Sequence, residues 1–191
     1  MTMIEHRRVT ACFPPLVALP VSLDRNKFLT SLMGELASTL QDVVGPDEAS
    51  GCMNAAGERV GELINEGYKS ALAVQELPRS RISEVLVDVS RRIASGFEIV
   101  DEDDEGIVMA NRTCSCGEKL KGGTAMCVMT ANVFGVIVAE NLGYARVVLE
   151  RRPIDGVPAC LLRIYFQPAG GEDAQGREYF RQVRHQRYRG G

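Results

Sequence analysis

Histidine is scarce in this chain: there are two, His6 and His185, and both lie close to the ends. A Ser-His-Asp set, a phosphate-binding loop and a dinucleotide fingerprint are also lacking. These absences argue against the common hydrolase, kinase and dehydrogenase chemistries, so we do not expect an enzyme; the remaining route to catalysis would be thiol redox chemistry. We interpret Glu140 and Asn141 as the exposed end of a helix rather than as an acid and base pair.

The sequence also lacks a recognisable signal peptide and a clear membrane span. Residues 1–9 are polar, and the apolar stretch after them is broken by three prolines. The longest uncharged run, residues 122–139, is at the short limit for a span and contains glycine, threonine and asparagine, so it predicts a buried helix. We therefore expect a cytoplasmic protein. Thiols stay reduced there, which favours metal binding or redox chemistry over disulfides for clustered cysteines.

A net positive charge is lacking outside the C-terminal end. Residues 177–191 contain five arginines and one glutamate, whereas the rest of the chain is acidic. Such a tail can bind nucleic acid or an acidic partner, but charged tails are commonly solvated extensions. Because no helix-turn-helix is evident, we do not expect direct nucleic-acid binding.

The length of 191 residues suits one domain with extra residues at its ends. We predict an N-terminal arm over residues 1–22, a regulatory domain over residues 23–168, and a basic, disordered tail over residues 169–191. Apolar content of 45% is ordinary for a globular protein and allows a sizeable core.

Hydrophobic periodicity predicts four helices and two hairpins. Asp24 is a plausible N-cap for the first helix, and Asp47 or Ser50 for the second. The pattern indicates an α+β domain in which N-terminal helices precede a mainly antiparallel sheet of about four strands with a buried central helix. The predicted helices are 24–44, 47–72, 78–95 and 124–142, and the predicted strands are 97–100, 107–110, 144–150 and 160–166.

The second predicted helix is rich in glycine, at Gly51, Gly57, Gly61 and Gly67. Each costs roughly 1 kcal/mol of helix propensity against alanine. Small residues in an apolar helix suggest that another backbone packs closely, either from the same chain or from a second subunit. We expect a homodimer formed through the N-terminal helices.

Four of the six cysteines occur between residues 114 and 160. Cys114 and Cys116 lie in a loop after a strand, and Cys160 begins another strand. If Thr124 caps the central helix, Cys127 lies in its first turn, where free N–H groups stabilise a thiolate. These positions can converge on a metal, although the spacing is not that of a zinc ribbon. The alternative is that Cys127 and Cys160 are small buried hydrophobic residues.

Three segments, 111–117, 127–135 and 141–147, carry a resemblance to the methanogen output domain family, whose small domains occur alone or attached to prokaryotic signalling proteins. Upstream segments at 23–25, 49–51 and 86–93 fit as well, and the likeness covers about residues 20–167. The resemblance implies that Cys114, Cys127 and Cys160 occupy the family's three cysteine positions, and the nearby Cys116 offers a fourth ligand. Cys12 and Cys52 are interpreted as bystanders.

The order of these cysteines is also distantly similar to two other groups. One is the C-terminal part of repressors of iron–sulfur assembly, where three cysteines hold a cluster, and the other is the 4-vinyl reductase type of sensor domain, where cysteines and a glutamate hold zinc. The resemblance therefore implies either an iron–sulfur cluster or zinc. The chain differs from the pattern at Ser115, where the family has proline, and at Val157, where it has aspartate.

We therefore expect a non-enzymatic regulatory domain that senses redox state or a small ligand through this cysteine site. It would pass the change to a signalling or transcription-regulatory partner protein. The alternative is a metal-free ligand-binding or protein-interaction module. Its apolar pocket would be lined by Phe134, Ile137, Tyr144 and Ile164, for which core packing is the simpler explanation.

Overall fold

A computed structural model of the protein describes residues 24–112, 123–154, 157–168 and 175–182. The arm predicted over residues 1–22 lies outside this part. The order of elements confirms the α+β class, with helices first and an antiparallel sheet after them. The elements are α1 (Arg25–Val44), α2 (Pro46–Leu72), α3 (Arg79–Arg92), β1 (Glu98–Glu102), β2 (Gly106–Asn111), α4 (Gly123–Leu142), β3 (Tyr144–Ile154), β4 (Val157–Tyr165) and β5 (Arg177–Phe180).

Helices α1 and α2 meet at a sharp turn. Asp24 caps α1 as predicted, because its Oδ1 accepts a hydrogen bond from the Lys27 backbone N–H at 2.8 Å. Gly45 ends α1 with φ of +90°, a conformation that glycine adopts without strain, and Pro46 opens α2 at once. The predicted caps of the second helix, Asp47 and Ser50, were wrong, since both residues lie inside α2.

Two glycines of α2 bring its backbone close to α4. A Cβ atom at Gly57 would lie 2.9 Å from the Cβ of Asn132, and one at Gly61 would lie 2.9 Å from the Cβ of Val136. Real Cβ contacts are longer than this, so only glycine fits at either position. The close backbone that the glycines predicted is therefore α4 of the same chain.

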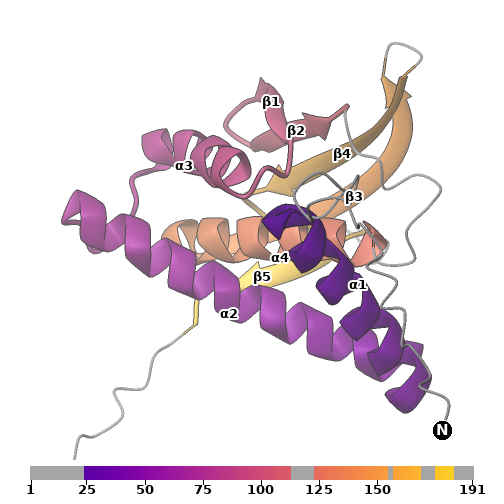
Figure 1. Cartoon of the computed structure of the whole chain (residues 1–191). Helices are drawn as coiled ribbons and strands as arrows, with labels where there is room; N and C mark the ends of the chain where they lie inside the picture. Colours follow the sequence, from indigo (N-terminus) through magenta and orange to yellow (C-terminus); the bar gives the residue numbers. More distant parts are fainter. Residues whose placement is uncertain (1–23, 113–122, 155–156, 169–174, 183–191) are drawn as a thin grey trace, which may run out of the picture.

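The sheet has the strand order β1-β2-β4-β3-β5, and every pairing in it is antiparallel. Helix α4 lies between the sheet and α2, with α3 beside it (Figure 1). The α4 residues Phe134 and Ile137 are fully buried, and they share a core with Leu86 of α3 and Leu162 of β4. Each such side chain contributes about 1.5–3 kcal/mol when it leaves water. The buried central helix is confirmed.

The C-terminal part of the sheet differs from the prediction. Strand β3 continues to Ile154 and β4 starts at Val157, so the predicted turn over residues 152–156 is shorter. A fifth strand, β5, pairs with β3 inside the segment that was predicted to be a disordered tail. That prediction was wrong for residues 177–180, and the structure does not describe residues 183–191.

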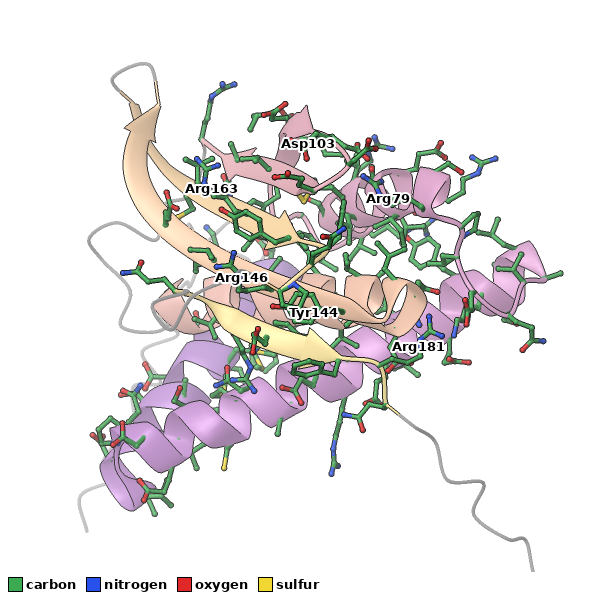
Figure 2. The ribbon with its side chains drawn as sticks, turned by 180° about the vertical axis from the view of Figure 1, so that it is seen from behind. Arg79, Asp103, Tyr144, Arg146, Arg163 and Arg181 are labelled. Carbon is green, nitrogen blue, oxygen red and sulfur yellow. The ribbon has the colours of Figure 1, made fainter. Side chains whose placement is uncertain are left out.

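Two arginines of the predicted basic tail make ion pairs with the body of the domain. Arg177 Nη2 lies 2.6 Å from Glu58 Oε1, and Arg181 Nη1 lies 2.8 Å from Glu76 Oε1. Figure 2 shows Arg181 just beyond the end of β5. These contacts hold β5 against α2 and its C-terminal end, so their positive charge serves the fold.

Among the helices that the structure describes, none combines the length and the apolar character needed to cross a bilayer.

Candidate functional site

Cys160 is the member of the predicted cysteine site whose side chain the structure describes. It is buried, with an exposed fraction of 5%, and it lies in the fourth position of β4. The prediction that Cys160 begins a strand was therefore wrong by three residues. In the sheet it pairs with Asn111 of β2 on one side and with Arg151 of β3 on the other. Cys160 is thus in the central strand, with little access to solvent.

Asn111, which pairs with Cys160 across the sheet, is close to Cys114 in the sequence. Asn111 is the last residue of β2, and Cys114 follows it by three positions. The Asn111 side chain is buried and donates a hydrogen bond to the Ser95 carbonyl, so the end of β2 is held in place.

Cys127 belongs to α4, but at a different depth in the helix than predicted. Helix α4 begins at Gly123, so Thr124 is a helical residue and not the N-cap. Cys127 is the fifth residue of the helix and lies just beyond its first turn. The free N–H groups and the helix dipole have most of their effect within the first turn. Its side chain, together with Cys114 and Cys116, lies outside the described residues.

The convergence of Cys114, Cys116, Cys127 and Cys160 stays a prediction. Within the described ranges, histidine, cysteine, aspartate and glutamate side chains nowhere gather in a group of three or more that could hold a metal. The chemistry of the predicted set fits a metal, because cysteine thiolates suit zinc and iron–sulfur clusters. Cys160 could serve as one donor from its fixed strand.

The residues predicted to line an apolar pocket lie inside the protein. Phe134, Ile137 and Ile164 belong to the core cluster. Tyr144 is also buried; its hydroxyl donates to Glu178 Oε1 at 2.5 Å, and its ring packs edge-on against Phe180. Burial, reinforced by Glu178, raises the pKa of Tyr144 to about 12. Their role as ligand contacts stays a prediction.

The sequence analysis missed a cavity between α2 and α3. Its volume is about 370 Å³, which is within the range of small-molecule sites. A Cβ at Gly67 would have no heavy atom within 4 Å, so the missing side chain leaves this space open. The lining is almost entirely apolar and consists of Ile64, Gly67, Tyr68, Ala71, Val89, Arg92 and Ile93. Gly67 was interpreted in the sequence analysis as a sign of close backbone packing, which was wrong at this position, because the glycine lines open space instead.

Two of the lining residues, Tyr68 and Arg92, share a hydrogen-bond acceptor, Asp88. The Tyr68 hydroxyl donates to Asp88 Oδ2 at 2.6 Å, and Arg92 Nε donates to the same oxygen at 2.6 Å. Burial and then Asp88 raise the pKa of Tyr68 to about 12. The hydrogen bonds from Tyr68 and from Arg92 lower the pKa of Asp88. The cavity therefore presents apolar walls with a charged edge.

The end of α4 is buried, contrary to the interpretation of Glu140 and Asn141 as an exposed helix end. Their exposed fractions are 7% and 5%. The Asn141 side chain accepts from the Leu77 backbone N–H at 2.7 Å and donates to Asn65 Oδ1 at 2.7 Å. Glu140 accepts from the Gln182 backbone N–H at 2.9 Å. Both residues connect α4 to distant segments and therefore have structural roles.

Comparison with known proteins gives a matching family model and a distantly similar solved structure. The model of the family described as methanogen output domain 1 matches residues 28–165. None of the curated proteins matches the chain. A crystal structure of the Fe(II) unliganded H-NOX protein from K. algicida, in a mutant form, has 14% sequence identity and a TM-score of 0.48. The likeness covers 77% of this chain and 76% of that one, and it is too weak to support an argument about function.

Proposed function

Because this chain belongs to the methanogen output domain 1 family, we propose that it is a signalling domain that senses redox state or a small ligand through a cysteine-bound metal. Cys114, Cys127 and Cys160 would hold the metal, with Cys116 as a fourth donor. The metal is either zinc or the iron of an iron–sulfur cluster. We propose that the domain acts by changing shape for a partner protein and that it has no catalytic role.

The position of Cys160 carries the proposal. It is buried in the central strand, and its neighbour Asn111 is three residues from Cys114. Metal binding would require Cys160 as a thiolate, and the positive charge of the metal would stabilise that thiolate in its buried position. A metal bound at this end of the sheet would tie β2, β4 and the start of α4 together.

Helix α4 offers a route from this site to the N-terminal helices. Cys127 is in the second turn of α4, and further along this helix Asn132, Val133 and Val136 pack directly against Gly57 and Gly61 of α2. Packing this close transmits a shift of one helix directly to the other, since neither can move independently. In this proposal α1 and α2 carry a homodimer contact and pass the change to a signalling or transcription-regulatory protein.

Substitution of single cysteines tests the proposal. The protein would be purified without oxygen, and iron, acid-labile sulfide and zinc would be measured together with the visible absorption spectrum. We expect Cys114→Ser, Cys127→Ser and Cys160→Ser each to lose most of the metal. Cys52→Ser is the matched control, because Cys52 is exposed on α2 and should leave the metal content unchanged.

Two results would decide against a cysteine-bound metal. One is wild-type protein that contains no stoichiometric metal, and the other is full metal content in the variant that lacks all three cysteines. Far-UV circular dichroism on each variant separates loss of metal from loss of fold, which matters most for the buried Cys160.

The cavity between α2 and α3 favours a second candidate function, a metal-free ligand-binding module. We propose that the cavity would take a small apolar molecule, with the Asp88–Arg92 pair at its edge. The dye 8-anilino-1-naphthalenesulfonate is a suitable probe, and Gly67→Leu should weaken its binding by at least roughly tenfold by filling the space. Gly51→Leu is the control, since Gly51 also has open space around it but lies outside the cavity. Equal binding by both variants would exclude the cavity as the site.

A further inference from the structure

Helix α1 exposes most of its large apolar side chains. Phe28 and Leu36 are 55% and 54% exposed, and Val43 is 75% exposed. The opposite side of the helix is used for packing: Ala37 is buried, and α1 contacts α2 and α4 there. In Figure 1, α1 lies on the outside of these two helices. Large apolar side chains that are exposed next to one another on a protein surface mark an interaction site.

The exposed residues form one continuous stripe, which we call the α1 face. It consists of Phe28, Leu29, Leu32, Leu36, Thr39 and Val43. At 3.6 residues per turn these positions fall within an arc of about 100°. From Leu29 onward the spacing alternates between three and four residues, which is the pattern of a helix that packs along a second helix. Another helix would cover the face along its length.

The charges of α1 indicate what kind of helix would cover the α1 face. Arg25 is the first residue of α1 and Asp42 lies in its last turn, while the first turn has no acidic residue and the last turn has no basic one. The positive charge is at the N-terminal end and the negative charge at the C-terminal end, and the helix dipole disfavours both placements. Among the described residues, neither side chain has an ion-pair partner. A partner with the opposite order of charges would satisfy both.

A second copy of α1, packed antiparallel, has that order. The point midway between Arg25 and Asp42 lies between Leu32 and Leu36, in the middle of the α1 face. A two-fold axis there would bring Arg25 of each copy next to Asp42 of the other, and each face would cover its own counterpart. This is the self-complementary contact that closed dimers use.

We infer that the α1 face is the homodimer interface of this protein and that two copies of α1 pack antiparallel across it. The inference rests on the homodimer of the proposed function, and it assigns that homodimer a surface and an orientation. The inference does not depend on the metal. A mass measurement therefore tests it separately: a dimer without metal would contradict the cysteine site alone, and a monomer with metal would contradict the interface alone.

The mass of the full chain in solution is the first test. Light scattering after size exclusion should give twice the 20.9 kDa of one chain. Leu36→Glu, in the middle of the face, should convert the dimer to a monomer. Ser31→Glu is the matched control, because Ser31 is exposed on α1 but lies outside the stripe, and it should stay dimeric. A monomeric wild type, or a Leu36→Glu variant that stays dimeric, would overturn the inference.

Charge reversal tests the orientation. Arg25→Glu and Asp42→Arg should each weaken dimerisation, by on the order of tenfold in the dissociation constant. The double variant should regain wild-type affinity, since each reversed charge would again face its opposite in the other copy. A double variant weaker than either single variant would contradict the antiparallel arrangement. Leu63→Glu on α2, also at an exposed apolar residue, should have no effect; dissociation by this variant instead of Leu36→Glu would place the contact on α2.

Discussion

Asp88 connects two helices with a single oxygen atom. Its Oδ2 accepts hydrogen bonds from Tyr68 of α2 and from Arg92 of α3, both at 2.6 Å. The Tyr68 pKa is raised and the Asp88 pKa is lowered, so the folded state retains the phenol proton and the carboxylate charge. These shifts make the stability of the contact between α2 and α3 dependent on pH.

The alkaline limb of this dependence can be measured. Tyr68 in the unfolded chain ionises near its ordinary value of 10.0, whereas in the folded protein its pKa is about 12. Its contribution to stability is present below the unfolded pKa and is lost as pH rises through the folded one. We expect the urea midpoint of the wild type to fall between about pH 10 and about pH 12, and that of Tyr68→Phe to fall less.

Tyr165→Phe is the control for this experiment. Tyr165 lies in β4, where the guanidinium carbon of Arg146 is 4.2 Å from the centroid of the Tyr165 ring. A Tyr68→Phe variant with the same pH dependence as the wild type would show that the hydrogen bond to Asp88 does not hold the phenol proton.

At the scale of elements, α2 and α4 approach each other closely, and glycine permits it. A Cβ at Gly61 would lie 2.9 Å from Val136 Cβ and 3.2 Å from the Val133 Cα. Because the second contact is with backbone, α4 itself would have to move. The same separation of the two helices is what couples Cys127 to α2 in the proposed function.

Alanine substitution along α2 should therefore have opposite effects at two glycines. Gly61→Ala should destabilise the protein by about 1–3 kcal/mol, since the core cannot accommodate the added methyl group. Gly51→Ala should stabilise it by about 0.5–1 kcal/mol, because the Cβ has open space and helix propensity improves. Denaturant unfolding measures both, and a Gly61→Ala variant as stable as Gly51→Ala would contradict the close packing.

Strand β5 contributes one large side chain, Tyr179, to the core of the domain. Tyr179 is 5% exposed, donates a hydrogen bond to Asn132 of α4, and lies against Gly135, where a Cβ would meet its ring. The next residue, Phe180, is 63% exposed. The strand therefore depends on Tyr179 far more than on its neighbour.

Tyr179→Ala should cost about 3–5 kcal/mol of unfolding free energy, the range for deleting a buried aromatic ring. Phe180→Ala, on the same strand, should cost less than about 1.5 kcal/mol, consistent with its edge contact to Tyr144. Equal losses in thermal unfolding experiments would show that β5 does not pack as described.

For the protein taken together, local patterns predicted α1 to α4 and the pairing of β1 with β2, because periodicity and caps act over a few residues. Strand β5 was missed because its four residues include Arg177 and Glu178, and because the contact that fixes it, Tyr179 with Asn132, spans 47 residues. The cavity between α2 and α3 was missed for the same reason. Its shape results from how two helices pack, and Gly67, which lines it, was interpreted as a sign of close packing.

The cysteine site was predicted from resemblance rather than from geometry. The role of Cys160 as a ligand stays a prediction. The structure places it in the buried interior of β4, opposite Asn111 of β2, and not at the start of the strand. Spacing alone could not indicate this, since the antiparallel pairing of β2 with β4 brings together residues 49 positions apart, Asn111 and Cys160.

X-ray absorption at the metal edge, on full-length protein purified without oxygen, tests the central claim most directly. Our account predicts iron or zinc in stoichiometric amount, with a first shell of at least three sulfur atoms at about 2.3 Å. It also predicts that this shell is lost in Cys160→Ser and retained in Cys52→Ser. A first shell made of nitrogen and oxygen alone, or protein without metal, would contradict it and leave the ligand-binding cavity as the basis of the signal.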